Sequence, residues 1–164
     1  MAHNEHYPQL PAGWAMCRLE DIMKYEQPTA YIVESTAYSD DYSVPVLTAG
    51  KSFVVGYTDE TEGIYNELPC IIFDDFTTDS RLVDFPFKVK SSAMKILQVR
   101  HGVEIEYVGL FMSRTRLIGD THKRYWISEY SKLEIPIPPK DEQKRIIEKG
   151  HQLFESLSTI EESL

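Results

Sequence analysis

The apolar residues of the chain form short runs over its first two thirds and one long stripe near its end. Five of these runs are rich in β-branched and aromatic residues, a composition that favours strands. They lie at 44–48, 52–57, 70–73, 85–89 and 95–99. Turn-forming residues separate them, most clearly at 49–51, 58–63 and 74–80. The pattern predicts a series of short strands, with a further strand at 125–127 and a proline-rich break at 135–139.

Helical spacing occurs in two places. Apolar residues between 103 and 112 recur at intervals of three and four, which predicts one short helix among the strands. After Pro139, the acidic Asp141 and Glu142 occupy the first turn of a second helix, where the helix dipole favours negative charge. That helix takes about 24 residues, or roughly 36 Å. Its apolar stripe consists of Ile146, Ile147, Gly150, Leu153, Phe154, Leu157, Ile160 and Leu164.

These elements predict an α+β fold: a twisted, mostly antiparallel β domain with short helices, followed by a long C-terminal helix. We place the domain at 1–139 and the helix at 140–164. The helix could fold back on its own domain, but a stripe this long after a proline stop favours pairing with a partner helix. The expected core residues are Trp14, Phe73, Phe85, Phe87 and Ile96.

The amino-acid composition indicates the class of protein and its compartment. The chain has 164 residues, 42% of them hydrophobic and 26% charged, as expected for one ordinary globular domain. No apolar run approaches the length of a membrane span, and the N-terminus lacks the pattern of a secretory signal. Cys17 and Cys70 could pair, but free thiols in a reducing compartment are the better interpretation. We therefore expect a cytoplasmic protein.

Charge is unevenly distributed along the chain. The net charge is −9, which alone argues against nucleic acid as a partner. However, residues 80–132 hold 10 Lys and Arg against 5 Asp and Glu, while residues 1–79 hold 3 against 14. A basic middle third can present one positive face on an otherwise acidic protein, although such a local bias can also average out over the folded surface.

Signatures of catalysis are scarce. The glycines form no phosphate-binding loop, and no Cys and His residues have zinc-site spacing. The one cluster that resembles a metal-dependent nuclease is Asp74, Asp75, Asp79 and Asp84, with Lys88 and Lys90 nearby. The acid-x-Lys pattern that such enzymes carry at the end of a strand is missing from this cluster, so we interpret Asp74 and Asp75 as residues that cap a turn. We expect no catalytic residue, no metal and no cofactor.

Two polar loops are better suited to recognition than to catalysis. One contains Arg114 and Arg116 and runs on through the glycine-punctuated segment 119–125; the other spans 77–81 between two apolar strands. Arginine and lysine neutralise phosphates, and the arginine fork also fits O6 and N7 of guanine. The arginines are candidate base or phosphate contacts, the lysines phosphate contacts, and the tyrosine a sugar or stacking contact. The candidate DNA-binding residues are Lys51, Thr77, Thr78, Arg81, Arg114, Arg116, Lys123, Arg124 and Tyr125.

Several segments resemble the target-recognition domains of type I restriction–modification specificity subunits. Leu10-Pro-Ala-Gly-Trp14, with residues 18–22 after it, resembles their opening, and residues 70–78, 83–92 and 122–128 are similar to their middle segments. Ile135-Pro-Ile-Pro-Pro139, followed by Glu142, Gln143 and Ile146, resembles their closing strand and spacer helix. The resemblance extends from about Pro8 to Leu157.

This resemblance implies a non-catalytic protein that reads one half of a split double-stranded DNA target. Methyltransferase subunits would be its partners, with a motor–nuclease subunit as a further one, and the C-terminal helix would pair with a second copy or with the other half of the specificity subunit. The full subunit has two such domains and two helices, whereas this chain holds one of each. The alternatives are a metal-dependent nuclease and an interaction module that binds methyltransferase subunits without reading DNA.

Overall fold

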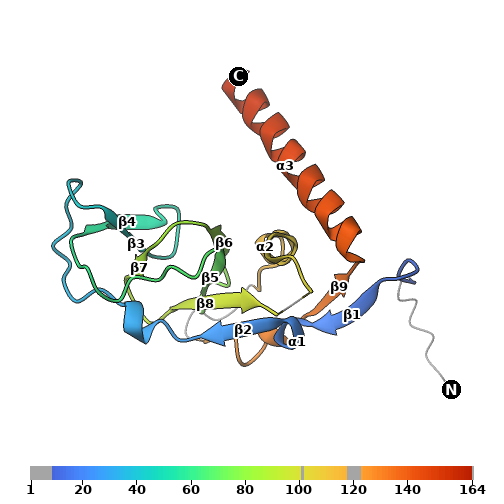
Figure 1. Cartoon of the computed structure of the whole chain (residues 1–164), viewed down its shortest axis with the longest axis horizontal. Coiled ribbons are helices and arrows are strands. Elements are labelled where there is room, and N and C mark those ends of the chain that lie inside the picture. The colour runs from blue at the N-terminus through green and yellow to red at the C-terminus, as the bar shows by residue number, and fades with distance from the viewer. Residues whose placement is uncertain (1–8, 101, 118–122, 164) are drawn as a thin grey trace.

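Within the residues that the structure describes, the chain forms three small sheets and a protruding helix (Figure 1). The computed structural model describes residues 9–100, 102–117 and 123–163. The strands are β1 (Ala15–Arg18), β2 (Met23–Glu26), β3 (Val44–Leu47), β4 (Val54–Thr58), β5 (Cys70–Asp74), β6 (Ser80–Val83), β7 (Lys88–Val89), β8 (Met94–Val99) and β9 (Glu134–Ile137). The helices are α1 (Leu19–Ile22), α2 (Ile105–Ser113) and α3 (Lys140–Ser163), with short 3-10 turns η1 (Thr29–Tyr31) and η2 (Tyr130–Lys132). The predicted α+β fold is confirmed.

The central sheet has the strand order β2-β8-β5-β6, and all its pairs are antiparallel. Every residue of β5 is buried, because apolar residues cover both faces of the sheet. Ile71 and Phe73 face one core with α2, while Cys70 and Ile72 face a second core with β7. Burial on both faces explains why the run 70–73 is continuously apolar rather than alternating.

A second sheet, with the order β4-β3-β7, lies at one end of the molecule. Its β3 and β7 strands are parallel, which makes them the exception among the described strand pairs. The predicted strand 85–89 is shortened to Lys88–Val89, and Phe85 is 36% exposed. Phe85 is therefore not a core residue as predicted, because the chain reaches the sheet only after Pro86; Phe73, Phe87 and Ile96 are buried as predicted.

The third sheet joins the two ends of the domain. Residues 134–137, most of them within the proline-rich break predicted at 135–139, form β9 and pair antiparallel with β1. The sheet tolerates Pro136 because β9 pairs with β1 along one edge only, so a proline, which lacks an N–H, can occupy a position whose N–H would face away from β1. Trp14, predicted to be core, is only half-buried, and its indole Nε1 donates a hydrogen bond to Glu142 at 3.0 Å. The start of the chain is thereby tied to the start of α3.

Two other predictions were wrong. The predicted strand 125–127 is a turn, since its backbone N–H groups are taken by the carboxylate of Asp75 rather than by a neighbouring strand. The predicted polar loop at 77–81 ends earlier, at Asp79, because residues 80–83 form β6 against β5. The short helix expected at 103–112 is confirmed as α2.

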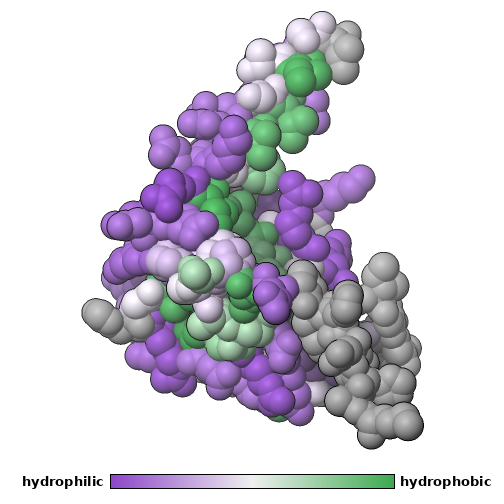
Figure 2. Space-filling view, turned by 90° about the vertical axis from the view of Figure 1, so that its right-hand side faces the viewer, coloured by the Kyte–Doolittle hydropathy of each residue, from purple (hydrophilic) through white to green (hydrophobic). Residues whose placement is uncertain are grey.

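Helix α3 projects from the domain and carries the C-terminal end of the described chain away from it (Figure 1). Its first turns pack on the body: Ile146 and Ile147 contact the core that contains α2, and Gly150 faces Leu110 so closely that a Cβ would lie 3.2 Å from Leu110 Cδ1. Beyond this point the helix is exposed. Figure 2 shows apolar side chains running along the helix from its free end toward the domain.

Candidate DNA-binding surface

The turn between β5 and β6 is built around Asp74. Its carboxylate accepts hydrogen bonds from the Phe76 N–H at 3.0 Å and from the Thr77 hydroxyl at 2.8 Å, and its carbonyl accepts one from the Thr78 N–H at 2.9 Å. Thr78 adopts a left-handed conformation, with φ of 59°. These contacts fix residues 74–79 as a rigid projection at the end of a buried strand.

Thr78 does not lie on the surface of this turn. Its side chain is fully buried, and its hydroxyl accepts a hydrogen bond from the Leu117 N–H at 2.9 Å. This contact ties the turn to the segment that follows α2. The prediction that Thr78 contacts DNA is therefore corrected: its hydroxyl is used inside the fold.

Asp75 joins the turn to a second segment, 123–126. Its carboxylate is buried and accepts hydrogen bonds from the backbone N–H groups of Tyr125 at 3.1 Å and Trp126 at 2.7 Å. The same Tyr125 N–H also lies 2.9 Å from the Asp75 carbonyl. Tyr125 is only 3% exposed, so its ring is packed in the core rather than presented to a ligand, and this prediction too is corrected.

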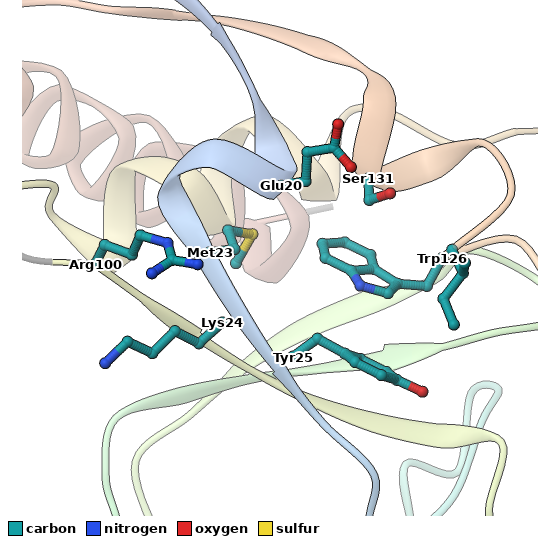
Figure 3. A pocket seen from close by; sticks show the side chains of 8 residues that line it. Glu20, Met23, Lys24, Tyr25, Arg100, Trp126 and Ser131 are labelled. Carbon is teal, nitrogen blue, oxygen red and sulfur yellow. The ribbon is translucent and has the colours of Figure 1, made fainter.

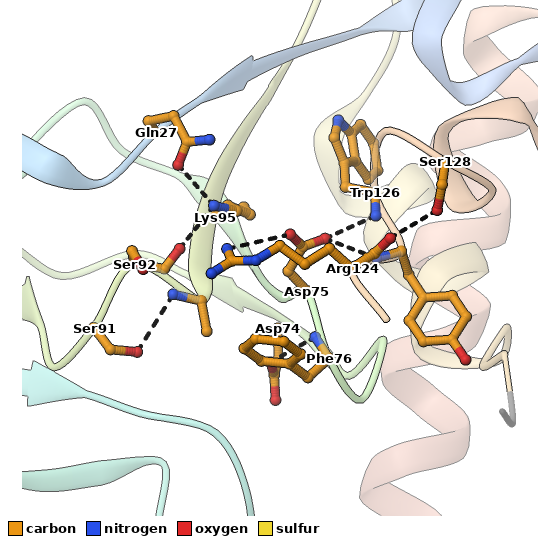
Figure 4. Close-up of polar contacts among 12 residues, drawn as sticks. Gln27, Asp74, Asp75, Phe76, Ser91, Ser92, Lys95, Arg124, Trp126 and Ser128 are labelled. Carbon is orange, nitrogen blue, oxygen red and sulfur yellow. Dashed lines mark hydrogen bonds and ion pairs between the residues drawn. The ribbon is translucent and has the colours of Figure 1, made fainter. Parts of the chain in front are cut away.

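Arg124 lies on the surface above this junction (Figure 4). Its side chain is 53% exposed, and its Nη1 is 3.8 Å from the Asp75 carboxylate. Its guanidinium carbon is 5.0 Å from the centre of the Phe76 ring, within the range of a cation–π contact. The side chain is thus held on two sides, while the rest of the guanidinium remains open to solvent.

Three more predicted residues lie in or beside the segments that flank this turn. Arg116 donates a hydrogen bond from Nη2 to the Thr77 carbonyl at 3.1 Å. Arg81, on β6, donates to the Gly50 carbonyl at 3.4 Å and lies over the Phe53 ring at 4.7 Å. Lys51 follows Gly50 and is exposed. The basic turn surface, as we define it, consists of Lys51, Thr77, Arg81, Arg116 and Arg124.

Two predicted residues lie at the margin of this surface. Arg114 is exposed and ends α2, two residues before Arg116. Lys123 is exposed next to Arg124, but it forms an ion pair with Glu129 and its Nζ lies 5.8 Å from the Tyr125 ring centre. Residues 119–122 of the predicted loop lie outside the described residues.

The structure adds a residue that sequence reasoning missed, Lys95. It is 2% exposed, and its Nζ donates hydrogen bonds to Gln27 Oε1 at 2.6 Å and to the Ser92 carbonyl at 2.7 Å (Figure 4). Burial lowers its pKa, and the nearby Arg124 does so as well, while Asp75 acts in the opposite direction. A lysine inside the apolar strand β8 was the available signal, because such a charge requires dedicated partners.

A hollow of about 440 Å³ adjoins this region, on the other side of Trp126 (Figure 3). Tyr25 and Trp126 line one part of it, and Lys24 and Arg100 line another. The Nζ of Lys95 lies 5.9 Å from the centre of the Tyr25 ring. Burial raises the pKa of Tyr25 most, the charge of Asp75 raises it further, and the charge of Arg124 lowers it. Cationic and aromatic side chains therefore continue from the turn toward β2.

Two members of the acidic cluster of the alternative nuclease interpretation, Asp74 and Asp75, have structural roles. Asp74 and Asp75 are 4% exposed and accept the hydrogen bonds described above. Lys88 points elsewhere: its Nζ is 3.3 Å from Glu60 and donates to the Glu62 carbonyl at 2.7 Å. Among the described residues, no group of three or more His, Cys, Asp or Glu side chains could hold a metal ion.

The exposed part of α3 forms a second surface of interest. Leu153, Phe154, Leu157 and Ile160 are each at least half exposed, between 50% and 56%. In contrast, the earlier stripe residues Ile146, Ile147 and Gly150 face the domain itself. Leu164, the last predicted member of the stripe, lies outside the described residues. Within the part of the chain that the structure describes, no helix is long and apolar enough to cross a membrane.

Solved structures share this fold. A structure of a type I restriction–modification system, determined for its complex assembly and conformational transition, matches with a TM-score of 0.70 and 14% identity, covering 99% of this chain and 43% of the other. The S subunit from M. genitalium matches with a TM-score of 0.68 and 16% identity, covering 94% of this chain and 43% of the other. The HsdS subunit from Thermoanaerobacter tengcongensis matches with a TM-score of 0.62 and 14% identity, covering 96% and 42%.

Comparison of amino-acid sequences identifies the family of the chain, whereas the solved structures show only its fold. The chain is 48% identical over 133 residues to the EcoR124I/EcoR124II type I restriction enzyme specificity subunit of Escherichia coli. The aligned region covers 77% of this chain and 33% of that subunit. It therefore spans about a third of the length of this relative. The family model described as the type I restriction modification DNA specificity domain matches residues 11–164. The chain belongs to the family of type I restriction–modification DNA specificity domains.

Proposed function

We propose that this chain reads one half of a bipartite double-stranded DNA target, as a target-recognition domain of a type I restriction–modification complex. The observation that carries this proposal is the 48% identity to a specificity subunit. The basic turn surface supports it, because exposed cations on a rigid turn are the arrangement that DNA recognition requires.

The surface has the chemistry for both kinds of DNA contact. Lys51 and Arg116 present exposed charge suited to phosphates, while Arg81 and Arg124 are held against aromatic rings. Two of the three carboxylates of the turn, those of Asp74 and Asp75, are buried and hydrogen-bonded, whereas Asp79 remains partly exposed. We retain as DNA contacts Lys51, Thr77, Arg81, Arg114, Arg116, Lys123 and Arg124.

Catalysis in this proposal belongs to other subunits. The chain acts without a cofactor of its own, in the cytoplasm, where methyltransferase subunits and a motor–nuclease subunit assemble on it. The structural use of the acidic residues supports this division, because their oxygens and the Lys88 ammonium already have partners within the fold.

The C-terminal helix supplies the second half of the proposal. Residues 1–139 act as the recognition domain, and 140–164 act as a spacer helix that pairs with a second copy or with the other half of a specificity subunit. The apolar side chains from Leu153 to Ile160 support this assignment, since exposed apolar side chains at helical spacing are suited to a helical partner. Ile146, Ile147 and Gly150 serve the packing of the helix on its own domain.

Selection from a randomised duplex pool tests the proposal. The purified chain, alone and with a cognate methyltransferase subunit, is bound to the pool at low salt, and shifted DNA is recovered and sequenced. Enrichment of one short motif is expected, because direct readout discriminates between base pairs. Pairing through α3 with no enrichment in either condition would instead favour an interaction module, and cleavage of the pool on adding Mg²⁺ would contradict the non-catalytic assignment.

A further inference from the structure

We infer that Arg124 is a base-reading residue that recognises guanine, and that Asp75 and Phe76 position it. This inference rests on the proposed function, because it assigns a specific part of the recognition to one side chain. It arises from the way in which the Arg124 guanidinium is held above the β5–β6 turn (Figure 4).

The guanidinium is restrained on one face and at one edge. The Phe76 ring lies 5.0 Å from Cζ, and the Asp75 carboxylate lies 3.8 Å from Nη1. An arginine side chain carries several freely rotating bonds, and ordering them costs free energy on binding. Because these contacts order the side chain before DNA arrives, its remaining donors point in a defined direction.

The supports of Arg124 are themselves fixed. Asp75 is held by the backbone N–H groups of Tyr125 and Trp126, at 3.1 and 2.7 Å, so its carboxylate cannot follow a moving arginine. The backbone of Phe76 is fixed through its own N–H, which donates to Asp74 at 3.0 Å. The arginine therefore sits on a frame that belongs to the buried end of β5.

This arrangement suits a base better than a phosphate. A carboxylate 3.8 Å from the guanidinium reduces the net charge of the pair, and charge is the main attraction for a phosphate. It does not reduce the number of N–H donors on the open side of the fork. Two parallel acceptors, O6 and N7 of guanine in the major groove, match the geometry of that fork.

The experiment uses the duplex that the wild-type chain enriches from the randomised pool. Each guanine is replaced in turn by 7-deazaguanine, which lacks the N7 acceptor but still pairs with cytosine. At one guanine the wild-type chain should lose about tenfold in affinity. The Arg124→Ala variant, which has no donor at this place, should bind the natural and the 7-deaza duplex about equally at that position.

Asp75 and Phe76 are tested as positioning residues by the ratio of the affinities for the natural and the 7-deaza duplex. Asp75→Asn retains an oxygen for the two backbone N–H groups but removes the charge beside Arg124, and Phe76→Leu removes the aromatic face. Each should lower the discrimination at that guanine several-fold, and Phe76→Tyr should restore what Phe76→Leu loses. Because Asp75→Asn also removes a negative charge, it should strengthen low-salt binding to unrelated DNA while it lowers the discrimination. Arg18→Lys, on β1 and paired with Glu20, is the control and should leave the ratio unchanged.

The possible failures are distinct. If the pool yields no motif, DNA recognition itself fails, and guanine reading fails with it. If a motif is enriched but contains no guanine sensitive to 7-deaza substitution, or if Arg124→Ala keeps the wild-type ratio of affinities for the natural and the 7-deaza duplex at every guanine, DNA recognition stands and the role of Arg124 is overturned.

Discussion

The side chain of Gln143 binds the backbone N–H of Glu104, with the amide oxygen 2.9 Å from the nitrogen. Gln143 is 1% exposed, and its amide nitrogen also donates to the Pro138 carbonyl at 3.0 Å. One buried side chain thus joins the start of α2 to the start of α3, and it fixes the direction in which the projecting helix leaves the domain.

We expect Gln143→Ala to lower the free energy of unfolding by about 2 kcal/mol, because it leaves the partly buried N–H of Glu104 and the buried carbonyl of Pro138 without their partner. Urea unfolding followed by circular dichroism measures this change. Gln152→Ala is the matched control, since Gln152 is exposed on the same helix, and it should change the stability by less than about 0.5 kcal/mol. Equal effects of the two variants would show that Gln143 is not an anchor.

Two phenylalanines near β7 should differ sharply in their contribution to stability. Phe87 is fully buried, whereas Phe85 is 36% exposed. Replacing Phe87 with Ala should cost about 3–5 kcal/mol, because it leaves a cavity in the core. The same substitution at Phe85 should cost about 1 kcal/mol, since part of the ring is already in water. Thermal unfolding of both variants compares them directly, and a larger loss for Phe85 would contradict the packing described here.

The elements that the sequence predicted well are those set by local patterns. The continuous run at 70–73 became β5, and the helical spacing at 103–112 became α2. The start of α3 at Lys140 follows directly from Pro138 and Pro139, which cannot continue the preceding ladder. In each case neighbours in the sequence determine the structure.

The predictions were wrong where contacts with residues distant in the sequence determine the local structure. Tyr125 and its neighbours have strand composition, but Asp75, which lies 50 residues earlier, takes their N–H groups. Thr78 is polar and follows other polar residues, yet its hydroxyl binds Leu117, 39 residues later. Residue type therefore indicated a basic recognition surface, but which members face solvent depends on contacts that no local pattern contains.

Acid should weaken the fold through Glu60. Burial raises the pKa of this carboxyl, but the N–H groups of Glu34 and Ser35 and the Lys88 ammonium lower it more, so it lies below its ordinary value of 4.5. A lowered pKa contributes stability above the ordinary value, and this contribution is lost as the pH falls through the folded pKa. The excess stability of wild type over Glu60→Gln should therefore be full at pH 6 and shrink below pH 4.5.

Urea unfolding between about pH 6 and pH 3 tests this dependence. Glu155→Gln is the control, because Glu155 is exposed on α3 and its replacement should leave the stability at pH 6 almost unchanged. A constant difference between wild type and Glu60→Gln over this range would show that the Glu60 carboxyl is not stabilised by folding.

The exposed stripe of α3 should mediate association. We expect sedimentation equilibrium to show a concentration-dependent dimer for the wild-type chain. Leu157→Lys should weaken it at least about tenfold, because a charge would be buried in an apolar helix interface. Thr159→Lys adds the same charge away from the stripe and should leave the association nearly unchanged. A wild-type chain that remains monomeric at high micromolar concentration would contradict pairing with a second copy.

Arg116 offers a test of how the basic turn surface contacts DNA. Its Nη2 lies 3.1 Å from the Thr77 carbonyl, and the side chain is exposed beside the turn. If it neutralises a phosphate, Arg116→Ala should weaken binding to all duplexes alike and make the slope of log K against log salt less negative by about 1. Titrations of the enriched duplex and of a scrambled duplex at several salt concentrations measure both quantities.

The control for this experiment is Arg18→Ala, which removes the same charge on β1, away from the turn, and should leave the salt slope unchanged. A loss confined to the enriched duplex, with an unchanged slope, would instead assign Arg116 to a base. Equal slopes and affinities for wild type and Arg116→Ala would show that Arg116 does not contact DNA. Because an exposed arginine contributes little to folding, its removal should leave the melting temperature close to that of wild type, so a change in affinity reports on the DNA contact itself.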